Sequence, residues 1–260
     1  EKHIFRHNDP EHLAQLLAQA DPRRPKLVAF ESVYSMDGDI APLDEIVALA
    51  ERYDAMVFVD DSHASGFIGA TGRGTHEAKG VLGKIDIITT TLGKALGGAS
   101  GGCVSGHAEL VELCRQRARP YLFSNSVPPV IVAAALKVIE LVSRTTERRD
   151  KLEENARYWR RLLTEAGFDL KAGESPIVPV MLYNAKIAQE MARELFAEGI
   201  YVVGFFFPVV PKGQARIRTQ LSAAHEKHHL DRAIEAFVKV GDRLGVRGLG
   251  REEIVARFGL

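Results

Sequence analysis

The sequence is poor in cysteine and its charges cancel, and both features exclude whole classes of protein. Cys103 and Cys114 are the only cysteines among 260 residues, too few for a disulfide framework or a four-cysteine metal site. We expect both to be small, buried apolar residues in a protein of a reducing compartment. Lysine plus arginine and aspartate plus glutamate number 34 each, so no overall field favours nucleic acid or an anionic membrane.

Long hydrophobic runs are also missing. The longest, Val127–Leu136, contains two prolines and is soon followed by Lys137 and Glu140, so it is too short and too interrupted to span a bilayer. Hydrophobic residues still make up 46% of the chain, enough to bury a large core in one domain or two. The sequence therefore indicates a globular protein whose recognition of charge is local.

The first half of the chain alternates short apolar runs with amphipathic stretches, which is typical of a mainly parallel α/β sheet. The predicted helices are residues 12–20 and 42–50, and the predicted strands are residues 27–30, 56–59, 86–91 and 102–105. In such sheets, ligands bind beyond the carboxyl ends of the strands. Three or four strands are few for this architecture, and the chain opens on a helix, so we expect an N-terminal part of the domain to be absent.

The second half mixes strands and helices in a way that favours a separate, smaller α+β domain. Its predicted helices are residues 127–142, 151–167, 185–198 and 226–244, and its predicted strands are 177–182, 201–207 and 215–221. The domain prediction is a portion of a large α/β domain over residues 1–126, a connecting helix over 127–144, the small domain over 145–246 and a tail over 247–260.

A glycine-rich loop follows the strand predicted at residues 86–91, and Lys94 lies in it. The glycines at positions 93, 97, 98, 101 and 102 let the backbone turn sharply and approach a ligand. Lysine is rarely buried without a partner, and desolvation favours its neutral amine, which suits a Schiff-base nucleophile or a general base. A solvated lysine at a strand-to-loop corner is the plain alternative, and this segment alone favours neither.

Further polar side chains follow the predicted strands. Asp60 and His63 belong to the run Asp-Asp-Ser-His at a strand end, where an enclosed carboxylate needs a cation such as a protonated ring nitrogen. The alternative is that an aspartate caps the turn and that His63 is an ordinary loop residue. The hydroxyl groups of Ser35 and Thr91 suit a phosphate, a ring substituent or a turn cap. Ser124 and Asn125 are equally ambiguous by themselves.

Two patterns in the second half suggest ligand binding. Arg216 and Arg218 alternate on one face of a predicted strand, and one of them would bind a carboxylate through its two parallel donors; a solvent-facing pair is the alternative. The run from His225 to His229 fits the His-Glu-x-x-His pattern of zinc peptidases, with Glu226 as the base. Against a zinc site, the run resembles the entry to a helix and shows no third ligand.

Taken together, these residues resemble the signature of the α-oxoamine synthases, a family of pyridoxal-phosphate enzymes. The signature residues are Ser35, 60–63, 91–94 and Arg218. Within that family, three stretches are similar to the glycine C-acetyltransferases, namely residues 91–102, 115–126 and 204–218. The likeness extends to about Val246. It implies fold type I of the pyridoxal-phosphate-dependent transferases, an α/β fold with a large mainly parallel sheet domain and a smaller C-terminal domain.

The resemblance also implies roles for the residues of the first half. Lys94 would bind the aldehyde of pyridoxal 5'-phosphate covalently and later act as a base at the α-carbon of glycine. Asp60 would pair with the pyridinium nitrogen of the cofactor, and His63 would contact its phenolic oxygen. Ser35 and Thr91 would help to fix the cofactor, Thr91 through the phosphate.

The remaining roles concern partners. Ser124 and Asn125 would reach the phosphate of the cofactor in the neighbouring subunit of a homodimer, and Arg218 would hold the substrate carboxylate. The implied reaction joins glycine and acetyl-CoA to give 2-amino-3-ketobutyrate and CoA, or runs in reverse in threonine breakdown. A related synthase with another or broader acyl-CoA preference is the alternative, and a zinc peptidase is a distant one. The expected location is the cytoplasm, or the mitochondrion in a eukaryote.

Overall fold

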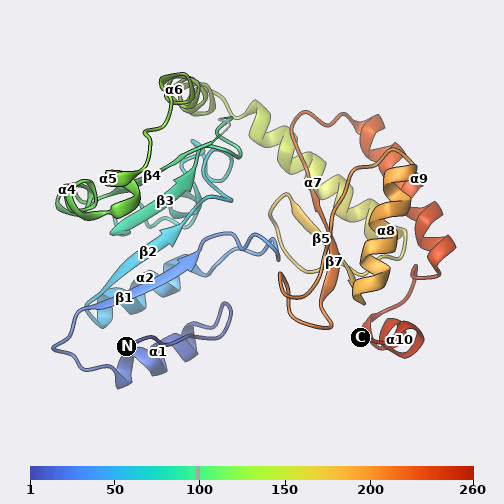
Figure 1. Ribbon diagram of the computed structural model, residues 1–260, viewed down its shortest axis with the longest axis horizontal. Helices are drawn as coiled ribbons and strands as arrows, with labels where there is room; N and C mark the ends of the chain where they lie inside the picture. Colours follow the sequence, from blue (N-terminus) through green and yellow to red (C-terminus); the bar gives the residue numbers. More distant parts are fainter. Residues whose placement is uncertain (98–99) are drawn as a thin grey trace. The chain divides into compact units, whose positions relative to one another are not determined.

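The computed structural model describes residues 1–97 and 100–260, and these form two compact units. The first unit contains residues 1–34 and 40–146, and the second contains residues 35–39 and 147–260 (Figure 1). The short segment 35–39 therefore interrupts the first unit in sequence but belongs to the second. Among the described residues, no helix combines the length and the apolar character that crossing a membrane requires.

The first unit is built on a four-stranded sheet with the order β1-β2-β3-β4 in the described part of the chain. Its strands are β1 (Lys26–Glu31), β2 (Ala55–Asp60), β3 (Ile87–Thr91) and β4 (Gly102–Gly106). The first three are parallel, and β4 runs antiparallel to β3. The predicted strands are therefore confirmed, and the carboxyl ends of β2 and β3 lie at one edge of the sheet.

Six helices accompany this sheet in the described residues: α1 (Pro10–Gln19), α2 (Leu43–Arg52), α3 (Thr75–Ala78), α4 (Ala108–Arg117), α5 (Arg119–Phe123) and α6 (Pro129–Arg144). Asp9 caps α1 by accepting a hydrogen bond from the His12 backbone N–H, as the Asp-Pro start predicts. The apolar stripe of α2 packs on β2 through Leu43, Val47 and Val57. The sequence analysis missed α3, α4 and α5.

One expectation about burial in this unit is wrong. On β2, Val57 and Val59 are buried while Met56 is exposed on the other face. Cys103 and Cys114 were expected to be buried, and both are exposed. Cys103 lies on β4, an edge strand whose residues are all exposed, and Cys114 lies on α4, which buries none of its side chains within the described residues. Composition indicates that a cysteine suits a core but does not say which strand or helix is covered.

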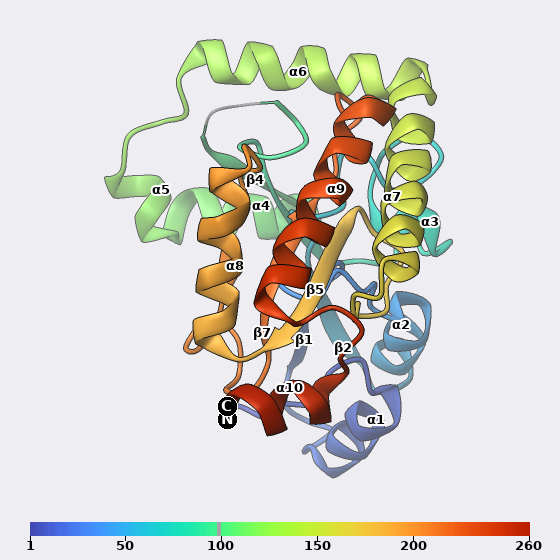
Figure 2. The ribbon, with the colours of Figure 1, turned by 90° about the vertical axis from the view of Figure 1, so that its right-hand side faces the viewer.

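The second unit contains a three-stranded antiparallel sheet with the order β5-β7-β6 in the described residues. The strands are β5 (Ile177–Tyr183), β7 (Ala215–Gln220) and β6 (Gly204–Phe205). Helices α7 (Glu147–Glu165), α8 (Ala185–Ala197) and α9 (Lys227–Leu244) pack with this sheet, and α8 and α9 lie side by side over β5 and β7 (Figure 2). Their shared core includes Trp159, Ile217 and Phe237.

Two segments of this unit differ from expectation. The strand predicted at residues 201–207 shrinks to the two residues of β6, because a turn begins at Phe206, whose carbonyl accepts hydrogen bonds from the N–H groups of Val209 and Val210. The segment expected to be a tail forms α10 (Arg251–Phe258), in which Ile254 is only 1% exposed. The Asn184 amide donates hydrogen bonds to the Phe258 and Gly259 carbonyls, so the end of the chain is part of the fold.

Candidate active site

The carboxyl ends of β2 and β3 bring two predicted site residues to one edge of the first sheet. Asp60 is the last residue of β2 and pairs with Thr89 of β3, two residues before Thr91 ends that strand. The Asp60 side chain is partly buried, and its Oδ1 accepts a hydrogen bond of 2.9 Å from the Ser62 backbone N–H. Among the described residues, no hydrogen bond reaches the other carboxylate oxygen, Oδ2.

The neighbouring Asp61 has a different environment. Its side chain is fully buried and accepts hydrogen bonds from the hydroxyls of Ser32 and Ser65, each at 2.6 Å, and from the Thr75 backbone N–H at 3.2 Å. A Cβ on Gly74 would lie 1.9 Å from Asp61 Oδ2, so only glycine fits at this position. Asp61 thus ties the end of β1, the turn after β2 and the start of α3 together, and it holds the turn that carries Asp60 and His63.

Lys94 lies in the loop between β3 and β4, and its side chain is exposed. Leu92 and Leu96 on either side of it are buried against Ala135 of α6, which anchors the loop and turns the lysine outward. An exposed side chain on an anchored loop is compatible with both alternatives from sequence. Gly98, one of the glycines of this loop, lies outside the described residues.

The hydroxyl of Thr91 closes the base of the Lys94 loop. It donates to the Gly101 carbonyl at 3.2 Å and accepts from the Gly93 N–H at 3.2 Å. A backbone bond from the Leu92 N–H to the Gly101 carbonyl, at 2.9 Å, lies beside it. Thr91 therefore fixes the loop that presents Lys94, and it would hold a phosphate only by exchanging the Gly101 carbonyl for a phosphate oxygen.

The other predicted residues of the first unit lie in loops. His63 is partly buried in the turn that follows β2, and Ala64 beside it is fully buried. Ser124 and Asn125 are exposed directly after α5. The structure brings Asp60, His63, Thr91 and Lys94 to strand ends at one edge of the first sheet, whereas Ser35 and Arg218 belong to the second unit.

In the second unit, the two arginines of β7 are not solvent-facing, so that alternative is wrong. Arg216 is 1% exposed and forms an ion pair with Asp37, at 2.6 Å between Nη1 and Oδ1. Arg218 is partly buried, donates from Nη1 to the Ser35 carbonyl at 2.8 Å, and stacks with its Cζ 5.0 Å from the centre of the Phe205 ring. Burial lowers the pKa of Arg218, and no carboxylate in the described part of the chain pairs with it.

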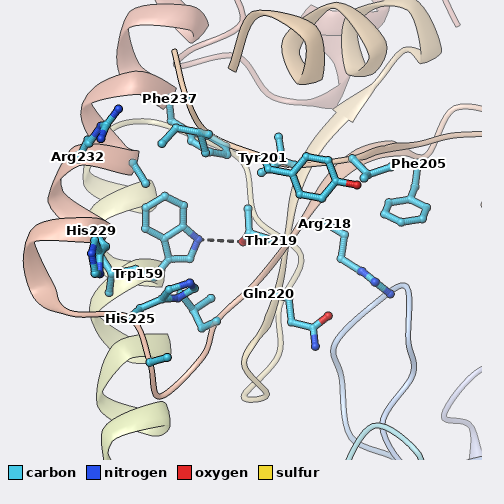
Figure 3. A pocket seen from close by; sticks show the side chains of 18 residues that line it. Trp159, Tyr201, Phe205, Arg218, Thr219, Gln220, His225, His229, Arg232 and Phe237 are labelled. Carbon is cyan, nitrogen blue, oxygen red and sulfur yellow. Dashed lines mark hydrogen bonds between the residues drawn. The ribbon is translucent and has the colours of Figure 1, made fainter. Parts of the chain in front are cut away.

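Arg218 also lines a cavity of about 620 Å³ in this unit. Figure 3 shows the indole of Trp159 on its wall, donating from Nε1 to the Thr219 hydroxyl at 2.9 Å, and Arg218 extending away from the indole. Apolar side chains make up most of the remaining wall, including Phe237 and Phe205. A partly buried guanidinium at one end of an apolar cavity is suited to a ligand that carries a carboxylate.

The histidines of the zinc-like pattern line the same cavity, but their geometry opposes a metal site. His225 Nδ1 accepts from the Ser222 N–H at 3.2 Å, and His229 Nδ1 accepts from the Glu226 N–H at 3.0 Å. Each neutral ring therefore carries its proton on Nε2 and has no free lone pair for zinc. Glu226 is the N-cap of α9 and pairs with Lys151, so it is not placed as a base. The pattern is a capping box at a helix start.

Sequence reasoning missed the residues that support the predicted ones. Asp61 was considered only as a turn cap, and Asp37 and Lys171 were not considered at all. One signal was available for Asp37. It lies two residues after Ser35 in a turn where acidic residues stand on both sides of Gly38. Its partners Lys171 and Arg216 lie more than 130 positions away, at 2.5 Å and 2.6 Å, and no local pattern identifies them.

Comparison with known proteins places this arrangement in a family. The chain matches the aminotransferase class I and II family over residues 2–237 and belongs to it. It is 55% identical over 247 residues to the 2-amino-3-ketobutyrate coenzyme A ligase of Escherichia coli K12, covering 94% of this chain and 62% of that protein. It is 50% identical over 240 residues to the mitochondrial enzyme of the same name from Homo sapiens, covering 92% and 57% of the two chains.

Solved structures give the same result. The serine palmitoyltransferase of Sphingomonas wittichii is 36% identical, with a TM-score of 0.89, over 94% of this chain and 61% of that chain. The 8-amino-7-oxononanoate synthase of Francisella tularensis is 28% identical, with a TM-score of 0.74, over 89% and 67%. The predicted fold type I and the kinship with the α-oxoamine synthases are confirmed. The chain spans about three fifths of the length of the curated relatives it matches.

Proposed function

We propose that the protein is an acyltransferase dependent on pyridoxal 5'-phosphate that joins glycine and acetyl-CoA to 2-amino-3-ketobutyrate and CoA, or catalyses the reverse reaction in threonine degradation. The observation that carries this proposal is the 50–55% identity to ligases of that name in E. coli and H. sapiens. It is supported by the placement of Asp60 at the carboxyl end of β2 and of Lys94 just beyond the carboxyl end of the adjacent parallel strand β3, where ligands bind in α/β sheets.

The groups at the sheet edge fit the proposed cofactor. An exposed amine on an anchored loop is free to react with an aldehyde, and Lys94 is such an amine. Asp60, with one oxygen held by the Ser62 N–H, has a carboxylate oxygen available to keep a pyridinium nitrogen charged. When bound, pyridoxal 5'-phosphate supplies the electron-withdrawing ring that stabilises charge on the α-carbon of glycine.

The other side chains would bind the cofactor and the substrate and hold them in position. His63, in the turn held by Asp61, would contact the phenolic oxygen of the cofactor, and Ser35 and Thr91 would fix the cofactor. Lys94 would also remove the proton from the α-carbon of glycine. Arg218 would hold the substrate carboxylate, which this reaction retains. The partly buried guanidinium of Arg218, paired with a backbone carbonyl and an aromatic ring, supports that assignment.

A homodimer with shared sites is part of the proposal. Ser124 and Asn125 would reach the cofactor phosphate of the neighbouring subunit. In support, both are exposed beside large apolar side chains that are also exposed, including Phe123 at 77% and Val130 at 71%. Such a surface is unusual for a monomer. Sedimentation should show a dimer, and Phe123→Asp should shift it toward monomers and lower activity; a fully active monomer would contradict this part of the proposal.

The function is tested by measuring free thiol released from acetyl-CoA. We expect release that depends on glycine in the wild type and falls at least about a thousandfold in Lys94→Ala. Arg218→Met should raise the KM for glycine strongly while leaving the visible band of the bound cofactor in place. Release without glycine, or an unchanged rate in Lys94→Ala, would refute the proposal.

Acyl preference and location are finer parts of the same proposal. One methylene changes selectivity by only about 1–3 kcal/mol, so turnover of acetyl-, propionyl- and succinyl-CoA should be compared directly. We expect acetyl-CoA to be preferred, because 2-amino-3-ketobutyrate, the compound in the relatives' name, corresponds to glycine plus a two-carbon acyl group. The cytoplasm, or the mitochondrion in a eukaryote, is the proposed location, in line with the mitochondrial designation of the human relative.

The division into a cofactor-binding part over residues 1–126, a connecting helix over 127–144 and a small domain over 145–246 also remains a proposal.

A further inference from the structure

Residues 35–38 form a docked segment, in which every residue offers an oxygen to a side chain of the second unit. The Ser35 carbonyl accepts from Arg218 at 2.8 Å, and the Met36 carbonyl accepts from Arg216 at 2.9 Å. The Asp37 carboxylate and the Gly38 carbonyl also accept hydrogen bonds from side chains of this unit. A segment of irregular backbone gripped at four successive residues has little freedom to move.

The second half of the docked segment is held by short hydrogen bonds, two of which join oppositely charged side chains. Asp37 Oδ1 accepts from Arg216 Nη1 at 2.6 Å and from Lys171 Nζ at 2.5 Å, and the Gly38 carbonyl accepts from the Ser175 hydroxyl at 2.6 Å. A Cβ on Gly38 would lie 2.3 Å from the Ile177 carbonyl, and its φ is +75°. Only glycine therefore fits at position 38 against β5.

Arg216 and Arg218 bind neighbouring carbonyls of the docked segment but differ in charge balance. Arg216 is almost fully buried, and Asp37 neutralises it; Gln214 takes two of its remaining donors, through its carbonyl and its Oε1. Arg218 has one hydrogen bond and one ring contact, and no ion pair within the described residues. Arg216 makes four hydrogen bonds within the protein, whereas Arg218 keeps most of its donors for a ligand.

Asp37 remains an anion in this network. Burial by itself would raise its pKa, but the hydrogen bonds from Lys171 and Arg216 outweigh burial, and the pKa lies below its usual value. Replacing the carboxylate by an amide would leave Arg216 buried beside an uncharged partner, a costly arrangement that the segment can relieve only by moving. Movement at Met36 and Asp37 would carry with it the adjoining Ser35 carbonyl, which Arg218 uses.

We propose that Asp37 and Arg216 are positioning residues that set the direction of the Arg218 guanidinium toward the carboxylate of the amino-acid substrate. This inference rests on the proposed function, because it takes Arg218 to be the carboxylate receptor. The ion pair fixes the docked segment, the segment fixes the Ser35 carbonyl, and that carbonyl fixes one donor of Arg218. The other donors of Arg218 then face the ligand in a set geometry.

The test uses two amines that differ only in the carboxylate. Glycine and methylamine both react with the bound aldehyde cofactor, and each dissociation constant is measured from the change in the visible band. In Asp37→Asn we expect binding of glycine to weaken about tenfold, with methylamine unchanged within about twofold. A general loss of structure would weaken both amines in parallel, and that result would overturn the inference, as would unchanged glycine binding.

Two further variants complete the test. Lys171→Met removes one cation from Asp37 and keeps Arg216, so a smaller loss, of about threefold for glycine alone, is expected, and it serves if Asp37→Asn folds poorly. Lys239→Met breaks an exposed ion pair with Glu198 in the same unit and should leave both amines unaffected. A wild type that binds neither amine would refute the proposed function itself, whereas normal glycine binding in both Asp37→Asn and Lys171→Met would refute only the positioning role.

Discussion

Lys94 and Asp60 in the first unit differ from Arg216 and Asp37 in the second in how much of their hydrogen-bonding capacity the protein uses. In the first unit, Lys94 is exposed and Asp60 accepts one hydrogen bond among the described residues. In the second unit, Arg216 is buried with four hydrogen bonds, and Asp37 binds two cations. The two residues that we propose meet a ligand keep unused hydrogen-bonding capacity, whereas Arg216 and Asp37 use theirs within the protein.

The same contrast appears within each unit at closer range. Asp60 and Asp61 are adjacent in sequence, yet Asp61 is fully buried with three donors and Asp60 is not. Arg216 and Arg218 repeat the pattern on β7. Each pair therefore offers a matched experiment, in which one member is expected to affect stability and the other to affect binding.

The largest effect on stability is expected from Asp61. Removing its carboxylate in Asp61→Ala leaves the Ser32 hydroxyl and the Thr75 N–H buried, and the Ser65 hydroxyl partly buried, without this acceptor, and should lower the free energy of unfolding by about 3–5 kcal/mol. Asp60→Ala should cost only about 0.5–1.5 kcal/mol, the value of one ordinary hydrogen bond. Urea unfolding followed by circular dichroism measures both. Equal losses would show that the two aspartates do not differ in role.

Gly74→Ala should be the next most damaging change. Its φ is +114°, and the new Cβ would lie 1.9 Å from Asp61 Oδ2, so we expect a loss of about 2–4 kcal/mol. Gly83→Ala is the matched control, because its φ is +80° and nothing lies within 4 Å of the added carbon. It should cost about 1 kcal/mol from backbone strain alone. A Gly74→Ala protein as stable as the control would contradict the buried position of Asp61.

Asp37 should affect how the free energy of unfolding of the second unit changes at acid pH. Its pKa is lower in the folded protein than in the unfolded chain, so its stabilising effect is complete above the unfolded value of about 3.9 and is lost as the pH falls through the folded value. Asp37→Asn should lower stability at pH 7 by about 2 kcal/mol and remove that acid dependence.

The fluorescence of Trp159 measures this prediction selectively, because it is the only tryptophan of the chain and lies in the core of the second unit. The wild type and Asp37→Asn should converge in stability at acid pH and diverge at neutral pH. Parallel curves over the whole range would mean that Asp37 carries no charge-dependent stabilisation.

The smallest effect is expected from His225. Burial, followed by the proximity of His229, lowers the pKa of His225 in the folded protein, so the unfolded chain binds its proton more readily. Stability should therefore fall as the pH drops below about 6.5, by less than about 1 kcal/mol. His225→Asn should flatten the Trp159 unfolding profile between about pH 5 and 7, whereas His3→Asn, at an exposed site, should not. A profile that keeps its slope would place the titrating group elsewhere.

Local patterns in the sequence predicted most of the fold. Apolar runs located β1, β2, β3, β5 and β7, and the predicted ranges of α1 and α9 agree with the structure to within a few residues. The helix over residues 251–258 and the short β6 were not predicted correctly. Their form depends on packing: Ile254 is buried only because α10 contacts the second sheet, and β6 ends where the turn at Phe206 begins.

The candidate site was predicted less completely than the fold. Strand ends identified Asp60, Thr91 and Lys94 because the chemistry of these residues is local to the motif. The functions of Asp37 and Asp61 depend on partners brought in from other elements, at hydrogen-bond distance across long stretches of chain. Neither composition nor periodicity carries that information, and a single sequence reveals it only through the folded structure.

The most direct test of the account is the site of covalent attachment of the cofactor. Borohydride reduction of the protein saturated with pyridoxal 5'-phosphate, followed by proteolysis and mass spectrometry, should place one pyridoxyl group per chain on the peptide that contains Lys94. The Lys94→Arg protein should yield no such peptide. Modification at another lysine with equal yield in the variant would contradict the assignment of Lys94 as the reactive amine of the open site.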